Sequence, residues 1–188
     1  MTGALLTLLN APALAAYTAS GLWGDDTIYA IAVRHARETP AAFTVRDCHR
    51  RLTYAALVEA ADRLAASLAG HGVRSGERVA VWLPSRVETA IALLACSHDL
   101  FAQLADRDFL RAIYRIGPPD AEMAPFADLT GSALEMPVSG DANQIMYLPF
   151  TSGTTAQPKG VLHSDNTLLA AARMMVRDWG LERSVLYT

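Results

Sequence analysis

The sequence lacks the features that mark several specialised classes of protein. Its 188 residues include only two cysteines, Cys48 and Cys96, with no spacing typical of a metal site or a disulfide framework, so we expect two reduced thiols. No block of like charges occurs and the formal net charge is only −3, so nothing indicates binding to nucleic acid or to an anionic membrane. Internal repeats and low-complexity tracts are also absent. What remains is the composition of a soluble intracellular enzyme, long enough for one domain with its own core.

A long hydrophobic run is missing as well. The stretch 4–16 is apolar and rich in alanine, and its residues 13–15, Ala-Leu-Ala, resemble a signal-peptide cleavage site. It lacks a positively charged start, however, and Asn10 and Pro12 interrupt it. It is also too short to cross a bilayer. We therefore predict a cytoplasmic protein with no membrane span.

The most informative segment follows an apolar strand predicted over residues 145–150. A loop of small and hydroxylic residues begins there, and its glycines allow backbone conformations that are closed to other residues. Backbone N–H groups in such a loop can form a concave anion site, to which hydroxyl groups add donors and Lys159 adds a positive charge suited to phosphate. The pattern predicts a loop that binds polyphosphate. Its candidate binding residues are Thr151, Ser152, Gly153, Thr154, Thr155, Ala156, Gln157, Pro158, Lys159 and Gly160.

This loop is not the common P-loop, which needs a Gly-Lys-Ser/Thr ending. Lys159 is instead preceded by Pro158 and followed by Gly160. The run resembles the signature Thr-Ser-Gly-Thr-Thr-Gly-x-Pro-Lys-Gly of the adenylate-forming superfamily, which includes acyl-CoA synthetases, aryl-acid ligases, peptide-synthetase adenylation domains and luciferases. Every fixed position but one matches, since Ala156 replaces a glycine at a cost of about 1 kcal/mol if that position needs a positive φ. The alternative is a surface turn rich in serine and threonine.

A second block, residues 52–97, favours an α/β fold. Thr53 is a good N-cap, and the helix after it is expected to end near Gly70 and Gly72. A buried strand over residues 78–83 and a second helix over residues 86–96 follow, an order typical of a layered α/β sheet. This block also resembles the N-terminal subdomain of the same superfamily, although any βα unit is the alternative. The expected buried face of the first helix consists of Leu57, Ala61, Leu64 and Leu68.

The first fifty residues carry a weaker resemblance. The start of cyclohexanecarboxylate–CoA ligases and 2,3-dihydroxybenzoate–AMP ligases is similar to the residues Tyr17, Gly21-Leu22-Trp23, Asp26-Thr27, His35-Ala36 and Pro40. The simpler interpretation is an amphipathic helix over residues 28–37 tethered by an aromatic arm. Both interpretations can hold together, and only the first bears on the substrate.

A further helix is predicted directly after the loop. Ser164 or Asn166 can cap it, and it should run to about Trp179, just before Gly180. Its positive N-terminal end would favour anions near the loop. We interpret His163, between the loop and the helix, as a structural residue rather than a proton-transfer group. The apolar stripe expected to face the core consists of Leu168, Leu169, Ala172, Val176 and Trp179.

The chain departs from the family in its extent. The interval from Glu88 to Thr151 is too short for the family's further elements, and Ser97/His98 looks like a seam left by a deletion or by an omitted stretch. A helix is predicted over residues 98–112, a loop over 116–141 and a final strand over 184–188. The family's C-terminal domain would lie beyond this point. We therefore predict an incomplete N-terminal AMP-binding domain of layered α/β type over residues 1–188, divided into 1–51, 52–97, 98–140 and 141–188.

The resemblance implies a ligase of fatty acid metabolism that joins a small carboxylic acid to AMP and passes the acyl group to coenzyme A. Lys159 would be the catalytic residue that offsets the charge of the departing pyrophosphate, and Thr151 would help to hold the Mg²⁺ that accompanies ATP. The fragment alone would be inactive. Two alternatives stay open, an aryl-acid–AMP ligase that delivers to a carrier protein and a non-catalytic remnant with a structural loop. A homodimer is left open too.

Overall fold

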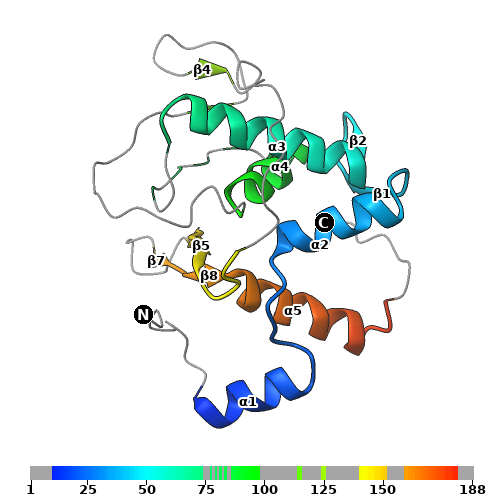
Figure 1. Ribbon diagram of the computed structural model, residues 1–188, viewed down its shortest axis with the longest axis vertical. Coiled ribbons are helices and arrows are strands. Elements are labelled where there is room, and N and C mark those ends of the chain that lie inside the picture. Colours follow the sequence, from blue (N-terminus) through cyan, green and yellow to red (C-terminus); the bar gives the residue numbers. More distant parts are fainter. Residues whose placement is uncertain are drawn as a thin grey trace. The chain divides into compact units, whose positions relative to one another are not determined.

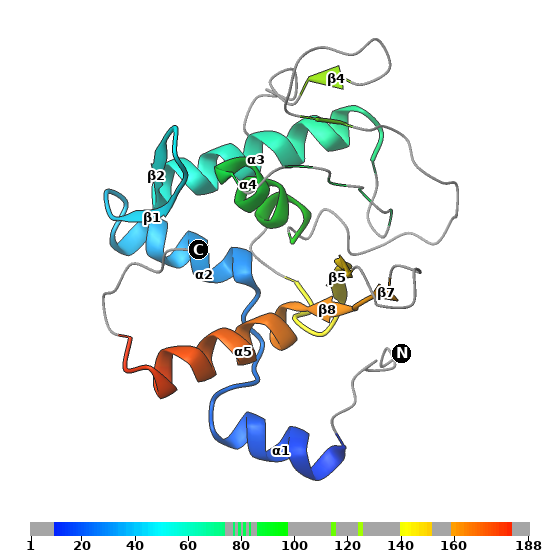
Figure 2. The ribbon, with the colours of Figure 1, turned by 180° about the vertical axis from the view of Figure 1, so that it is seen from behind.

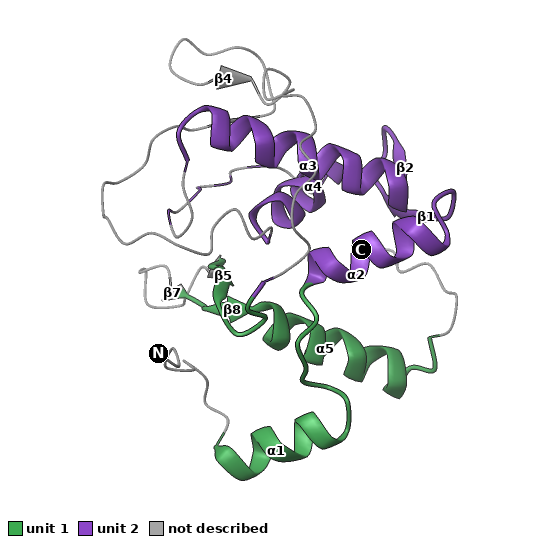
Figure 3. Ribbon diagram, in the orientation of Figure 1, with its two compact units in different colours: residues 1–27, 141–188 green, residues 28–140 purple. Residues whose placement is uncertain are grey.

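The structure is a computed structural model of the 188-residue chain, shown in Figure 1. It describes residues 10–73, 77, 79, 81, 83, 86–97, 114–115, 124–125, 140–151 and 159–181. These residues belong to two compact units, which Figure 3 colours separately. Unit 1 combines residues 1–27 with residues 141–188, and unit 2 consists of residues 28–140.

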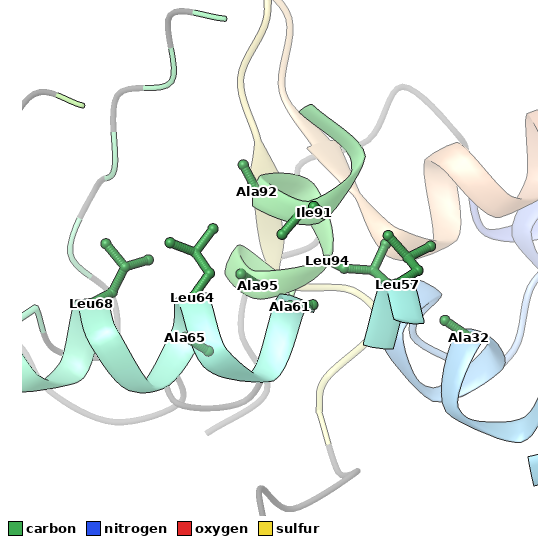
Figure 4. Close-up of a cluster of buried hydrophobic side chains, with 10 residues drawn as sticks. All are labelled: Ala32, Leu57, Ala61, Leu64, Ala65, Leu68, Ile91, Ala92, Leu94 and Ala95. Carbon is green, nitrogen blue, oxygen red and sulfur yellow. The ribbon is translucent and has the colours of Figure 1, made fainter. Parts of the chain in front are cut away.

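Unit 2 is built around two helices that pack side by side, α3 (Tyr54–Gly70) and α4 (Val87–Cys96) (Figures 1 and 2). The predicted buried face of α3 is confirmed, since all four expected residues are at most 5% exposed. Helix α2 (Ile28–Glu38) adds Ala32 to the same cluster, as Figure 4 shows. The core of unit 2 consists of Ala32, Leu57, Ala61, Leu64, Ala65, Leu68, Ile91, Ala92, Leu94 and Ala95.

A hairpin leads into α3 and touches the start of α4. Strands β1 (Phe43–Arg46) and β2 (Arg51–Thr53) pair antiparallel. Thr53 ends the second strand and caps α3, because its hydroxyl accepts from the backbone N–H of Ala56 at 3.2 Å, as the sequence predicted. In the turn of the hairpin the Asp47 carboxylate accepts from the backbone N–H groups of His49 and Arg50 at 2.7 and 2.8 Å.

The buried strand predicted over residues 78–83 is only half covered where the structure describes it. Val79 and Leu83 pack against the core of unit 2, whereas Val81 between them is 47% exposed. In a regular strand these three alternate residues would share one face, so the exposure of Val81 interrupts the predicted buried run. The prediction of a buried strand is therefore wrong at Val81.

The first described element of unit 1 is a helix that the sequence analysis missed, α1 (Ala11–Ala19). Asn10 is its N-cap and accepts from the backbone N–H of Ala13 at 2.9 Å, so the two residues expected to interrupt the apolar run start a helix instead. Gly21, at φ 73, ends this helix, and the backbone N–H of Leu22 bonds back to the carbonyl oxygen of Tyr17 at 2.9 Å. None of the described helices is long and apolar enough to cross a membrane.

Several short strands complete the described part of the chain. The single strand predicted over residues 145–150 is two strands, β5 (Ile145–Tyr147) and β6 (Phe150–Thr151), interrupted at Leu148 and Pro149. Within the predicted loop 116–141, β4 (Ala124–Pro125) pairs in parallel with β3 (Tyr114–Arg115), so that part is not loop. The helix predicted over residues 98–112 and the strand predicted over 184–188 lie outside the described residues.

Helix α5 (Asp165–Asp178) confirms the helix predicted after the loop, but not the face predicted to be buried. Val176 and Trp179 of the predicted stripe are 49% and 61% exposed. The side that packs instead carries Ala170 and Met174, which meet Leu22 and Trp23 of the segment after α1. Tyr17 and Leu14 of α1 pack against this small cluster as well, as an aromatic arm would.

Candidate nucleotide-binding site

The two ends of the predicted phosphate loop face each other across a pair of strands. Strand β6 pairs antiparallel with β7 (Lys159–Gly160), which places Thr151 opposite Lys159 and Phe150 opposite Gly160. The structure thus brings together the predicted metal-holding threonine and the predicted catalytic lysine at the level of the backbone. The other predicted binding residues, Ser152, Gly153, Thr154, Thr155, Ala156, Gln157 and Pro158, lie outside the described residues.

A second strand pair extends this hairpin away from the loop. Strand β5 pairs antiparallel with β8 (His163–Ser164), with Ile145 opposite Ser164 and Tyr147 opposite His163. Between the two pairs, the backbone N–H of Val161 donates to the carbonyl oxygen of Pro149 at 3.0 Å. Residues 145–151 and 159–164 therefore form one continuous antiparallel hairpin, and its strands fix the separation of Thr151 and Lys159.

The N-terminus of α5 follows the hairpin directly, and the chain itself uses its first donors. Ser164 is the N-cap, one of the two residues predicted for that role, and its hydroxyl accepts from the backbone N–H of Thr167 at 3.3 Å. The Thr167 hydroxyl accepts in return from the backbone N–H of Ser164 at 3.0 Å. The backbone N–H of Asn166 donates to the carbonyl oxygen of Ala142 at 3.0 Å. Because these groups are already paired within the chain, they are not available to an anion.

His163 has the surroundings of a structural residue, as predicted. Its ring stacks on Tyr147 of the paired strand, with 6.1 Å between the ring centroids. Its Nδ1 lies 3.3 Å from the hydroxyl oxygen of Thr167. That hydroxyl also donates to the carbonyl oxygen of Ser164 at 2.9 Å.

Two asparagines at the base of the hairpin form a polar network that the sequence analysis did not find. Asn143 precedes β5 and Asn166 follows β8, and Nδ2 of Asn166 donates to Oδ1 of Asn143 at 3.1 Å. Asn166 is fully buried and also pairs with both backbone groups of Gly24, accepting from its N–H at 3.0 Å and donating to its carbonyl oxygen at 2.7 Å. Oδ1 of Asn143 accepts a second hydrogen bond from Nε1 of Trp23 at 3.0 Å. Partners so distant in sequence leave no local signature.

The described residues offer little to a metal ion on their own. In the described part of the chain, no three side chains of His, Cys, Asp or Glu gather into a group that could hold one. Thr151 is the one predicted metal-holding residue. A single hydroxyl fits Mg²⁺ only as an ion that keeps several waters and is held mainly by the phosphates of its nucleotide.

Comparison with known proteins gives the family. The model of the family described as "AMP-binding enzyme" matches residues 32–98 and 102–188, which include the whole hairpin and α5. The chain belongs to this family. The adenylate-forming resemblance of the Thr151–Gly160 run is thereby confirmed.

Among its relatives in sequence are ligases of both predicted types. The medium-chain fatty-acid–CoA ligase of Escherichia coli is 27% identical over 208 aligned positions, which cover 85% of this chain and 36% of that protein. The salicyl-AMP ligase (salicyl-S-ArCP synthetase) of Mycobacterium tuberculosis is 38% identical over 86 positions, 43% of this chain and 15% of that protein. The chain thus spans about a third or less of the length of these relatives.

The fold agrees with the family. The apo structure of Mycobacterium smegmatis MbtA superimposes with a TM-score of 0.71 at 25% identity, over 92% of this chain and 40% of that one. The predicted fold class is therefore confirmed: the chain is mixed α/β and corresponds to part of the adenylate-forming fold.

The comparisons also bear on the seam predicted at Ser97/His98. The family match is interrupted at residues 99–101. The alignment with the Escherichia coli ligase has 208 positions, more than the 188 residues of this chain, so it includes positions that have no counterpart here. Both observations support an internal gap relative to the family.

Proposed function

We propose that this chain provides the triphosphate-binding part of an ATP-dependent ligase that activates a small carboxylic acid as an acyl-adenylate and passes it to coenzyme A. The observation that carries the proposal is the pairing of Thr151 with Lys159, which brings the two ends of the predicted loop together. Membership of the AMP-binding family supports the nucleotide. The medium-chain fatty-acid–CoA ligase among its relatives supports the acid and the acceptor. The cytoplasmic location and the division into four segments remain predictions.

The reaction requires the protein to position the acid and ATP and to neutralise the charge on the leaving pyrophosphate. It does not require a covalent intermediate on the protein. A carboxylate oxygen of the acid attacks the α-phosphorus of ATP, and the bond from that phosphorus to the bridging oxygen breaks, so pyrophosphate leaves. The loop from Thr151 to Gly160 holds the β- and γ-phosphates, and Lys159 offsets the negative charge that grows on the leaving group. Thr151 would add a hydroxyl ligand to the Mg²⁺ that accompanies ATP. The thiol of coenzyme A then attacks the acyl carbonyl and releases AMP.

A second candidate, an aryl-acid–AMP ligase that delivers its adenylate to a carrier protein, is favoured by the salicyl-AMP ligase among the relatives. Both candidates share the first half-reaction and differ in the acceptor. The third possibility, a remnant whose loop is structural, predicts no nucleotide chemistry at all.

Acid-dependent exchange of pyrophosphate into ATP separates the three when it is measured on the uninterrupted gene product with a panel of aliphatic and aromatic acids, because the fragment alone is expected to be inactive. Exchange with one class of acid supports a ligase, and adding coenzyme A or a carrier protein then identifies the acceptor. No exchange with any acid, together with no binding of Mg-ATP, would leave the structural remnant as the correct interpretation.

The role of Lys159 is tested by separating the two half-reactions. In a complete homologue, the substitution that corresponds to Lys159→Ala should slow adenylate formation by about a hundredfold, the scale of losing one preorganised charge-stabilising group, and should leave thioester formation from added acyl-adenylate nearly unchanged. The reason is that pyrophosphate has left before the second step. Single-turnover rates of each step provide the measurement, and Asp178→Asn, at the exposed far end of α5, is the control for handling. An equal loss in both steps contradicts the assignment.

A further inference from the structure

The segment after α1 is joined to the base of the loop hairpin by hydrogen bonds whose direction is unambiguous. We call residues 20–27 the N-terminal arm. The indole N–H of Trp23 can only donate, so the oxygen of Asn143 has to face it. The amide of Asn166 meets the N–H and the carbonyl oxygen of Gly24 at once, which fixes its oxygen and its nitrogen as well. Each amide therefore has one orientation that satisfies all its partners.

These asparagines lie where they can stabilise the hairpin that carries the loop. Asn143 lies two residues before the start of β5, and Asn166 lies two residues after the end of β8. The two asparagines therefore lie at the two ends of the hairpin. The four strands between them have only two or three residues each, and an isolated two-stranded hairpin is at best marginally stable in water. The arm supplies what such a hairpin lacks: a polar clamp at its base and the apolar contact of Trp23 with Ala170.

We propose that Asn143 and Asn166 are positioning residues through which the N-terminal arm holds Thr151 and Lys159 in register for polyphosphate binding. The inference rests on the proposed function of the loop. It assigns to the arm a role in phosphate affinity, although the arm lies more than a hundred residues away in sequence and is not itself in the predicted loop.

Asn143 allows a matched pair of variants, because in the network its side chain only accepts. Asn143→Asp keeps the oxygen that receives the protons of Trp23 and Asn166, whereas Asn143→Leu has a similar size and no acceptor. Losing these two bonds should weaken binding of magnesium tripolyphosphate to the full chain by about tenfold, while the aspartate variant should stay within about twofold of the wild type. Calorimetry measures the dissociation constants, and tripolyphosphate serves as the probe because it has no adenosine to bind elsewhere.

A purely structural role makes a different prediction. It would lower the thermal midpoint of Asn143→Leu and reduce the number of binding sites measured, yet leave the dissociation constant of the folded fraction unchanged. Hydrogen exchange adds a second readout, since the backbone amides of residues 150–151 and 159–160 should exchange faster in Asn143→Leu than in Asn143→Asp. If Asn143→Leu does not fold, Trp23→Phe, which removes one donor and keeps an aromatic ring, should weaken binding by about threefold.

The outcomes distinguish this inference from the proposed function. If Lys159→Ala loses tripolyphosphate binding while Asn143→Leu, or Trp23→Phe in its place, binds as the wild type does, the role of the arm is refuted and the loop assignment stands. If the wild type does not bind the probe, or Lys159→Ala binds it unchanged, the proposed function fails and the inference fails with it.

Discussion

Oδ2 of Asp47 accepts a hydrogen bond from the backbone N–H of Val87, the first residue of α4, at 3.1 Å. The N-cap of that helix, Arg86, makes no side-chain capping bond. A carboxylate from the β1–β2 turn, forty residues earlier, takes over this role and also places negative charge at the positive end of the helix. Arg50 of the same turn forms an ion pair with Glu88 in the first turn of α4, so the hairpin fastens the helix end at two points.

The Asp47 contact predicts a dependence of stability on pH. Hydrogen bonds from the backbone N–H groups of Arg50, His49 and Val87, in that order of size, lower the pKa of Asp47 to about 2 from an ordinary value of 3.8. Because the pKa is lower in the folded state, the carboxylate stabilises the fold fully above about pH 4, and this contribution is lost as the pH falls toward about 2. Asp47→Asn should therefore lower the free energy of unfolding at neutral pH, with a difference from wild type that narrows below about pH 4.

Urea unfolding of both proteins at a series of pH values gives this difference directly. Asp178→Asn is the matched control, because Asp178 is exposed and pairs only with the neighbouring Arg177 in the described contacts. A difference in free energy of unfolding between wild type and Asp47→Asn that stays constant from neutral to acid pH would contradict the assignment.

Tyr29 gives a second prediction, for the packing of α2 on α3. Its side chain is 4% exposed and its hydroxyl donates to Oδ1 of Asp62 at 2.6 Å. Burial, and then the hydrogen bond to Asp62, raise the pKa of Tyr29 well above its ordinary value. Removing the hydroxyl in Tyr29→Phe should lower the free energy of unfolding by about 1.5–3 kcal/mol, as for a hydrogen bond to a charged group.

A double-mutant cycle with Asp62→Ala separates the bond from the packing of the ring. The sum of the two single losses in free energy of unfolding should exceed the loss in the double variant. The reason is that the second substitution can no longer remove the hydrogen bond, which the first has already removed. Strict additivity of the two losses would show that Tyr29 and Asp62 contribute independently.

The two cysteines should differ in reactivity. Cys48 is exposed, whereas burial raises the pKa of the Cys96 thiol, at the end of α4, to about 11. At pH 8 only about one Cys96 in a thousand would be a thiolate, the form that reacts with alkylating agents. Iodoacetamide should therefore modify Cys48 first in the folded chain, and mass spectrometry of the peptides identifies the site. In denaturant both should react at similar rates; equal rates in the folded chain would contradict the burial of Cys96.

Much of the helical structure was predictable, because its signals are local. Thr53 and Ser164 cap their helices as residues of that type do, and Gly72 and Gly180 end them with φ values of 83° and 60°. The same rules would have found α1, had Asn10 been considered as a cap rather than as an interruption.

The buried faces of the helices and the contacts between residues distant in sequence were harder to predict. They depend on which other segment of the chain packs against each helix. The apolar residues of α5 are spread around much of the helix. Trp23 packs against the side that carries Ala170, whereas Val176 is exposed. The clamp of Asn143 and Asn166 has no pattern in sequence at all. The loop motif itself was identified correctly by its family, while the pairing that fixes its ends came only from the structure.

The clamp also has a consequence for how the protein is made. Trp23 and Asn143 are separated by 120 positions, and at a translation rate of about 5–20 residues per second the arm waits roughly 6–24 s for its partner. All of unit 2 is synthesised during that interval. On the nascent chain, Leu22 and Trp23 therefore lack their packing partners in α5 throughout that interval.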